Sequence, residues 1–137
     1  MSLVLDCSLA MAWLYAAETT PAVRKVFELV EDGGAWVPSL WRLEVANVLE
    51  LGVRRGRSNS AFRDAALDDL AEFPIAIDAE TDHHAWTATL SLAIDRKLTV
   101  YDAAYLELAK RRRLPLATLD NDLRRAAIAE GVQLLGI

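Results

Sequence analysis

The stretch Ser2-Leu3-Val4-Leu5-Asp6, residues 2–6, is a short run of mostly apolar residues that ends in an acid. An unbroken apolar run of this length is typical of a strand buried on both faces of a parallel sheet. The stretch Pro115-Leu116-Ala117-Thr118-Leu119 repeats the plan and closes on Asp120. Two such strands at opposite ends of the chain favour a fold with a central sheet.

Helical patterns separate the apolar runs along the whole chain. Thr20 followed by Pro21 is a typical helix start, and Gly33 with Gly34 is a typical helix end. We expect helices at residues 8–17, 21–33, 39–55, 60–72, 80–95, 99–113 and 122–130, and further strands at 36–37, 74–77 and 132–137. Strands that alternate with helices predict one α/β domain over residues 1–137, in which a parallel sheet of about five strands lies between helical layers.

The composition indicates a single compact domain with a partner. A chain of 137 residues suits one hydrophobic core. The hydrophobic fraction of 53% and the mean hydropathy of +0.16 are high, so we expect another chain to cover some apolar surface. Cys7 is the only cysteine, and the N-terminus has neither a basic leader nor a membrane-spanning length of apolar residues. These features predict a cytoplasmic protein without a membrane span.

The net charge of -5 argues against tight, sequence-independent coating of nucleic acid, because such binding depends on lysine and arginine. It does not exclude a nuclease, which can gather acids at a metal site and keep basic residues at the rim. Arg54, Arg55 and Arg57 form one basic cluster, and residues 110–113 form another. Both clusters could serve that rim, or could simply complement the dipoles of helix C-termini.

Helical spacing separates two acids from the ordinary surface acids. Glu28, Glu50 and Glu107 each have a lysine or arginine three or four residues away, which predicts surface ion pairs. Glu44 and Asp102 have no cation at those spacings and lie among apolar residues. A carboxylate on an apolar face is costly unless a distant arginine or a metal compensates its charge.

Asp6 and Asp120 follow apolar strands, at the edge where ligands bind in open α/β sheets. If Glu44 and Asp102 point to the same edge, four carboxylates meet, and each pair repels by roughly 4 kcal/mol at 4 Å with an effective dielectric near 20. We therefore predict that these four residues are both catalytic groups and ligands of Mg²⁺ or Mn²⁺, which prefer oxygen donors and phosphate-bearing partners. Such an ion can activate water for phosphodiester hydrolysis.

Each acid also has a structural alternative. Asp6 and Asp120 could begin turns or cap helices, and residues 99–102 spell the T-x-x-D form of a capping box. Glu44 could pair with a remote arginine. Asp122 follows a turn and fits a helix N-cap better than a metal ligand.

The remaining candidates are weaker. Cys7 has no histidine near it in sequence, and His83 and His84 lack the spacing of a helical metal pair. The tryptophans are expected to be core or interface anchors rather than platforms for stacking bases. They are Trp13, Trp36, Trp41 and Trp86.

Several of these stretches also carry a family resemblance. They are Val4-Leu5-Asp6-Cys7-Ser8, Glu44 on a helix that begins near Pro38-Ser39, the run from Leu98 to Ala109, and Leu116-Ala117-Thr118-Leu119-Asp120. With them the chain resembles, from end to end, PIN-domain proteins of the VapC-type toxin branch. None of the four main acids departs from the pattern.

The resemblance implies a three-layer α/β/α domain and an activity. Asp6 and Asp102 would be the most direct metal ligands, Glu44 and Asp120 would complete the site, and Asp122 would be optional. Hydroxyls near the site would come from Ser8 and Thr118. The resemblance further implies Mg²⁺-dependent endonucleolytic cleavage of RNA, a homodimer, and inhibition by a cognate antitoxin whose C-terminal segment lies across the toxin near its active site.

Two rival functions are compatible with parts of this pattern. A phosphoacceptor receiver module is also acidic and α/β, but Asp6 has no acidic neighbour and no lysine follows the last strand. A PIN-domain nuclease of RNA processing or repair would work without an antitoxin. A short antitoxin-like reading frame just upstream would separate the two nuclease roles.

Overall fold

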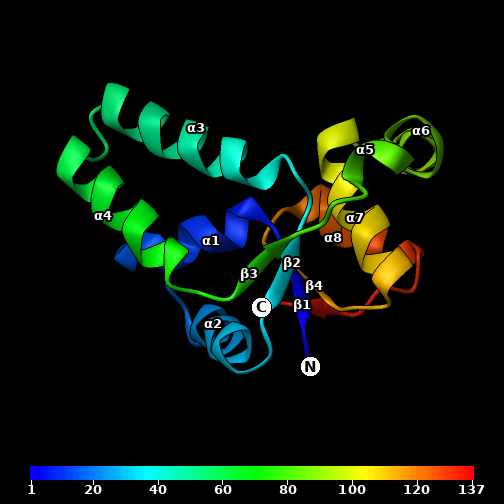
Figure 1. Cartoon of the computed structure of the whole chain (residues 1–137), viewed down its shortest axis with the longest axis horizontal. Helices are drawn as coiled ribbons and strands as arrows, with labels where there is room; N and C mark the ends of the chain where they lie inside the picture. The colour runs from blue at the N-terminus through cyan, green and yellow to red at the C-terminus, as the bar shows by residue number, and fades with distance from the viewer.

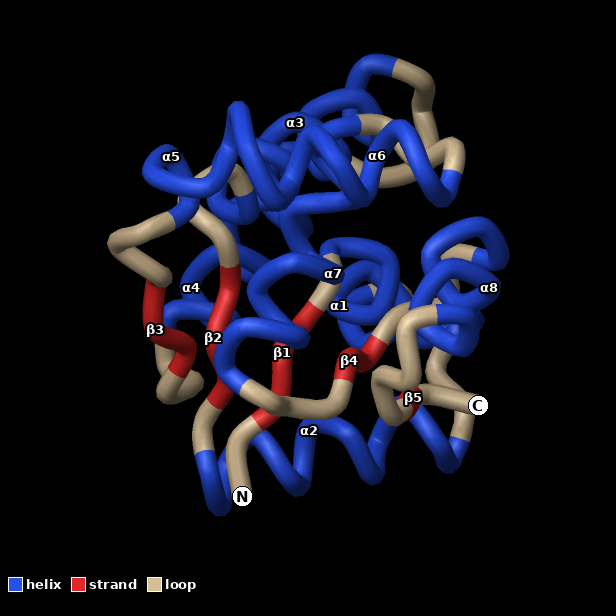
Figure 2. Tube along the Cα trace, turned by 90° about the vertical axis from the view of Figure 1, so that its right-hand side faces the viewer, coloured by secondary structure: helices blue, strands red, loops and turns tan.

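Five short strands form one parallel sheet at the centre of the molecule (Figure 2). The structure is a computed structural model that describes residues 1–137. The strands are β1 (Leu3–Leu5), β2 (Ala35–Val37), β3 (Ile75–Ile77), β4 (Leu116–Ala117) and β5 (Leu134–Leu135), in the order β3-β2-β1-β4-β5. The predicted parallel sheet of about five strands is confirmed.

Helices cover both sides of the sheet (Figure 1). They are α1 (Cys7–Leu14), α2 (Pro21–Gly33), α3 (Trp41–Arg54), α4 (Ser60–Ala71), α5 (Thr81–His84), α6 (Leu90–Arg96), α7 (Val100–Arg112) and α8 (Asn121–Ala129), with a 3-10 turn at Ala16–Glu18. Helices α1 and α2 lie on one side, and α7, with α5 and α6 beside it, lies on the other. The predicted α/β/α layering is confirmed, and no helix is both long and apolar enough to cross a membrane.

The core is built on β1 and α7. All three residues of β1 are buried, as the unbroken apolar run predicted. Residues 103–109 of α7 are buried without interruption, which is the pattern of a helix enclosed on all sides. Because Asp6 directly follows β1 and Asp102 lies in the first turn of α7, the most buried parts of the molecule hold two of the predicted site acids in place.

Capping side chains set the starts of several helices. Thr20 Oγ1 accepts a hydrogen bond from the Val23 N–H, and Pro21 is the first helical residue, as predicted. Asn59 caps α4 in the same way. Gly34 ends α2 with a φ of 75°, a left-handed conformation in which glycine has no side-chain penalty.

The helical structure predicted over residues 80–95 is confirmed, but it is not one regular α-helix. The structure divides it into α5, a π-helical segment at Ala85–Thr89, and α6. A π-helical turn shifts the face that the following helix presents. Here it leaves Trp86 exposed while Thr89 is buried.

Helices α3 and α4 form an antiparallel arm that projects away from the sheet (Figure 1). The turn between them includes Gly56, which has a φ of 76°. Only the first turn of α3 approaches the carboxyl ends of the strands, and this turn carries Glu44.

Candidate active site

Asp6 is a buried carboxylate held by two hydroxyl groups. It follows β1 directly, and only 4% of its surface is exposed. Ser8 Oγ and Thr118 Oγ1 donate to its Oδ2 atom at 2.7 and 2.6 Å. Burial raises the pKa of Asp6, the two hydroxyl bonds partly oppose this rise, and the charge of Asp120 adds to it. No lysine or arginine compensates the carboxylate.

The same two hydroxyls join the turns after β1 and β4. Ser8 Oγ accepts a hydrogen bond from the Leu119 N–H at 3.0 Å, and Thr118 Oγ1 accepts one from the Asp120 N–H at 3.1 Å. Ser8 and Thr118 are 110 residues apart in the sequence. Their bonds therefore fix the ends of two adjacent strands, and with them Asp6 and Asp120, relative to each other.

Asp120, rather than Asp122, is the N-cap of α8. Asp120 Oδ2 accepts a hydrogen bond from the Leu123 N–H at 2.8 Å. Asp122 lies in the first turn and forms an exposed ion pair with Arg125, so its predicted capping role is wrong. The capping alternative for Asp120 is confirmed, but the cap occupies only one carboxylate oxygen and leaves Oδ1 available.

Glu44 approaches the site from the first turn of α3. Its Oε1 accepts a hydrogen bond from the Tyr105 hydroxyl at 2.5 Å. Burial raises the pKa of Glu44, the Tyr105 bond opposes the rise, and the charges of Asp6 and Asp102 add to it. The alternative in which a remote arginine pairs with Glu44 is wrong, because no ion pair involves this residue.

Asp102 lies in the first turn of α7. Thr99 Oγ1 caps the helix by accepting a hydrogen bond from the Asp102 N–H at 3.1 Å. The return bond of a full capping box, from the Thr99 N–H to the Asp102 carboxylate, does not form. Burial and then the charges of Asp6, Asp120 and Asp122 raise the pKa of Asp102 to about 6.

The four predicted acids therefore lie at one edge of the sheet and repel one another. None of them forms an ion pair with lysine, arginine or histidine. As the side chains lie, no group of three or more acidic, imidazole or thiol side chains is arranged to hold a metal ion. The oxygen-only donor set still fits Mg²⁺, which keeps several waters and often binds through only one or two carboxylates. The metal-binding and catalytic roles of these four residues remain predictions.

Cys7 is not a nucleophile at neutral pH. Its side chain is buried at the start of α1. Burial, with the charges of Asp6 and Glu44, raises the pKa of the thiol to about 12. The thiol therefore stays protonated.

A second buried acid at the end of a strand was not identified from the sequence. Asp78 follows β3 as Asp6 follows β1, and only 1% of its surface is exposed. Arg111 Nη2 donates to Asp78 Oδ2 at 2.6 Å, and Arg112 Nη2 donates to Oδ1 at 3.1 Å. Burial opposes ionisation, but the two arginines outweigh it and lower the pKa of Asp78. This acid is compensated, so its position at a strand end does not make it a metal ligand.

The prediction that Glu107 forms an ordinary surface pair is wrong. Glu107 is 6% exposed, and its Oε2 accepts a hydrogen bond from Arg111 Nε at 2.7 Å. Lys110 instead pairs with Glu130. Spacing identified Arg111 as a partner, but it could not show that Asp78 shares this arginine from another element.

Internal contacts engage most of the two basic clusters. In addition to its bond with Asp78, Arg112 stacks on Trp36, with its guanidinium carbon 3.5 Å from the ring centroid. Arg54 pairs with Glu50, and Arg57 pairs with Glu18. These side-chain contacts were predicted by neither the rim nor the helix-dipole interpretation, and they leave Arg55 and Arg113 without ion pairs.

Comparison with known proteins identifies the fold family. A model of the PIN domain family matches residues 3–129. The chain belongs to the PIN-domain family. It is also 35% identical over 125 residues to Ribonuclease VapC3 of Pyrobaculum aerophilum, covering 90% of this chain and 92% of the relative. The resemblance to the VapC branch is thereby confirmed.

Solved structures share the fold of this PIN domain. PAE2754 from Pyrobaculum aerophilum superposes with a TM-score of 0.70 at 22% identity, covering 98% of this chain and 89% of the other. VapBC2 from Rickettsia felis, solved with a promoter DNA fragment, gives 0.65 at 13% identity, with 98% and 97% covered. FitAcB from Neisseria gonorrhoeae gives 0.65 at 18%, with 98% and 96% covered.

Proposed function

We propose that this PIN-domain protein is a Mg²⁺- or Mn²⁺-dependent endoribonuclease and the toxin of a toxin–antitoxin pair. The main support is the group of uncompensated carboxylates at the carboxyl edge of the sheet; in three of them, Asp6, Glu44 and Asp102, burial and the charges of neighbouring acids raise the pKa. The similarity to a protein named as a ribonuclease supports RNA as the substrate.

Asp6, Glu44, Asp102 and Asp120 would hold the ion. When bound, Mg²⁺ would supply a Lewis acid that activates water and offsets negative charge on the phosphate. Hydrogen bonds from Ser8 and Thr118 hold the Oδ2 atom of the Asp6 carboxylate. The carboxyl group of Asp102, with a pKa of about 6, can take up or release a proton near neutral pH before an ion binds.

A cleavage assay tests the nuclease. Wild type should cleave structured RNA in Mg²⁺ and lose this activity in EDTA, whereas Asp6→Asn and Asp102→Asn should stay folded and inactive. Asp68→Asn on the exposed face of α4 is the control and should cleave normally. Full activity of Asp102→Asn, or an inactive wild type, would overturn the proposal.

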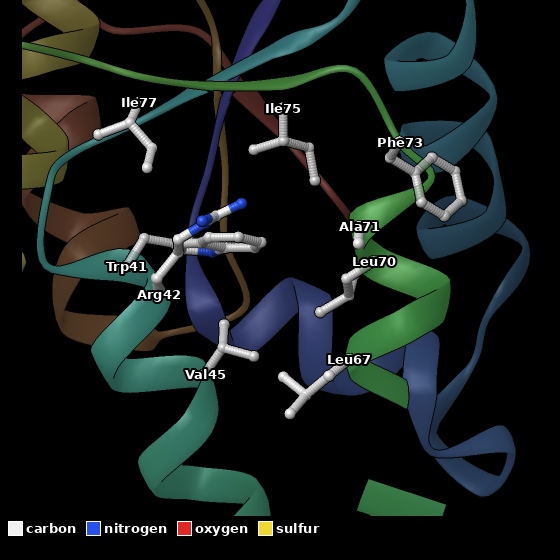
Figure 3. A pocket seen from close by; sticks show the side chains of 9 residues that line it. All are labelled: Trp41, Arg42, Val45, Leu67, Leu70, Ala71, Phe73, Ile75 and Ile77. Atoms are coloured by element: carbon white, nitrogen blue, oxygen red, sulfur yellow. The ribbon is translucent and has the colours of Figure 1, made fainter. Parts of the chain in front are cut away.

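An apolar groove between α3, α4 and β3 supports an antitoxin partner (Figure 3). It has a volume of about 310 Å³ and is lined by Trp41, Arg42, Val45, Leu67, Leu70, Ala71, Phe73, Ile75 and Ile77. Arg42 is the only charged residue of the lining and has no ionic partner, so the groove suits an apolar peptide that carries an acid. Trp41 and Glu44 share one turn of α3, so such a peptide would lie next to the carboxylates.

The groove can be tested with the product of a short reading frame upstream. We expect Leu67→Asp and Ile77→Asp to weaken binding of that protein while RNA cleavage is retained. If no upstream protein binds, the nuclease role in RNA processing without an antitoxin takes its place.

We also propose that a second copy of the chain covers an exposed apolar stripe. Trp86, Leu90 and Ile94 recur every four residues, and Val100 and Tyr101 lie exposed at the start of the neighbouring helix α7. Trp86 is 89% exposed, which fits an interface anchor and not a core residue.

A further inference from the structure

Tyr105 is a buried residue of α7 whose hydroxyl contacts Glu44, one of the predicted site acids. None of its surface is exposed, and its hydroxyl donates to Glu44 Oε1 at 2.5 Å. The two residues are 61 positions apart in sequence. This is the only hydrogen bond that the Glu44 side chain makes, and its Oε2 atom has no protein partner.

The bond joins two parts of the molecule that hold different acids. Glu44 belongs to α3, the first helix of the projecting arm, whereas Tyr105 belongs to the helix that carries Asp102. Asp102 and Tyr105 are three residues apart, a spacing that puts side chains next to each other on one helix face. Without the bond, repulsion from Asp6 and Asp102 would favour rotamers that turn the Glu44 carboxylate toward solvent.

We propose that Tyr105 is a positioning residue for Glu44: its hydroxyl holds Oε1, so that Oε2 faces the other carboxylates and is free to bind the ion. This inference rests on the proposed metal-dependent function. It gives Tyr105, three residues after Asp102, a role in metal affinity. The group responsible is an uncharged hydroxyl that does not contact RNA. Outer partners that orient metal-binding side chains contribute about ten- to a hundred-fold to metal affinity.

A second tyrosine shows that this fold can bury a tyrosine hydroxyl without giving it a hydrogen-bond partner. The Tyr15 hydroxyl is also buried, yet it has no hydrogen-bond partner. Its ring packs against Phe62 and Arg57, away from the carboxylates. Tyr15→Phe is therefore a matched control, because it removes a buried hydroxyl and no bond to the site.

Direct Mn²⁺ binding, measured by electron paramagnetic resonance and calorimetry without RNA, tests the inference. We expect Tyr105→Phe to weaken Mn²⁺ binding about ten-fold or more and Tyr15→Phe to leave it unchanged. In a Glu44→Gln background, Tyr105→Phe should add less than about two-fold, because a residue that acts through Glu44 loses its effect when that carboxylate is absent.

The outcomes separate this inference from the proposed function. If wild type binds no Mn²⁺ and cleaves no RNA, the proposed function fails. If wild type binds Mn²⁺ and Tyr105→Phe binds it equally well, only the role of Tyr105 is overturned. The increase in Tm with Mn²⁺ provides a second measurement should Tyr105→Phe be less stable without metal: an increase equal to that of wild type would also overturn the role.

Discussion

Asp102 is a residue whose pKa shows the effect of burying several carboxylates together in the site. Its carboxyl group has a pKa of about 6 because the chain buries it beside other acids and supplies no cation. The folded protein therefore binds a proton at Asp102 more tightly than the unfolded chain does. The site is destabilising when it is ionised and metal-free, and a bound ion would relieve this effect.

Replacing Asp102 should stabilise the metal-free protein at neutral pH. Because the pKa rises from 3.8 to about 6 on folding, stability falls as the pH increases through this window, and asparagine cannot lose a proton. We expect the Tm of Asp102→Asn in EDTA to exceed that of wild type by about 3 °C at pH 7, roughly 1 kcal/mol after allowance for partial exposure, with no gain at pH 4. Calorimetry at both pH values measures this, with Asp68→Asn as the control; an equal gain at both values would contradict it.

Thr118 supports Asp6, so its hydroxyl should stabilise the fold. Thr118→Val keeps the shape of the side chain but removes the donor to Asp6 and the acceptor of the Asp120 N–H. Leaving buried polar groups unpaired costs about 1–3 kcal/mol each, and we expect a loss of about 2 kcal/mol in urea unfolding. Thr87→Val, at an exposed site, should change stability by less than about 0.5 kcal/mol. Equal stabilities of the two variants would show that the network contributes little.

At the residue scale, sequence spacing could identify acids that have no compensating cation within their own helix. Glu44 and Asp102 were singled out because no cation lies three or four positions away, and the structure shows no cation from elsewhere. The same test failed for Glu107, which is buried and shares Arg111 with Asp78. Such sharing depends on the approach of β3 to the end of α7, which local spacing does not encode.

At the scale of elements, α7 has separate functions at its two ends. Its first turn carries Asp102, and its last turn carries Arg111 and Arg112, which both bind Asp78 at the end of β3. The ion pairs fix the C-terminal end of the helix on the edge strand of the sheet. The orientation of Asp102 and Tyr105 therefore depends on contacts made at the opposite end of the same helix.

Breaking the contact between α7 and β3 should be costly. Asp78→Asn removes a buried charge that two arginines share, and the loss of one partner of a buried ion pair costs about 3 kcal/mol. Because the pKa of Asp78 is lowered on folding, its stabilisation is present above about pH 4 and is lost as the pH falls further. Urea unfolding at pH 7 and pH 3 should show a smaller difference from wild type at pH 3 than at pH 7. Glu28→Gln, in an exposed pair with Lys25, is the control and should be nearly neutral.

Elements with strong local signals could be predicted, and those set by tertiary contacts could not. The apolar run of β1, the Thr20 cap and the glycine stop of α2 were all correct. The π-helical turn at Ala85–Thr89, within the helix predicted over residues 80–95, was missed, because the 3.6-residue period does not reveal such a turn. The N-cap of α8 was placed at Asp122 instead of Asp120, a shift within the usual error of helix ends.

At the scale of the whole molecule, the structure locates the apolar surface that the composition indicated. The groove beside β3 and the stripe on the π-helical segment and α6 lie on different elements. Two separate faces allow an antitoxin peptide and a second copy to bind together. The stripe lies on the same side of the sheet as α7, so a dimer formed there would leave the groove free.

The stripe can be tested by changing Trp86, which in a two-fold symmetric dimer would contribute from both chains. A tryptophan can bury roughly 200 Å², worth up to about 5 kcal/mol at about 25 cal/mol per Å². We expect wild type to be a dimer by light scattering at micromolar concentration and Trp86→Ser to be a monomer with an unchanged circular dichroism spectrum. Ile128→Ser, at an exposed apolar residue of α8, should remain a dimer. A monomeric wild type, or a Trp86→Ser dimer of undiminished affinity, would remove the stripe as the interface.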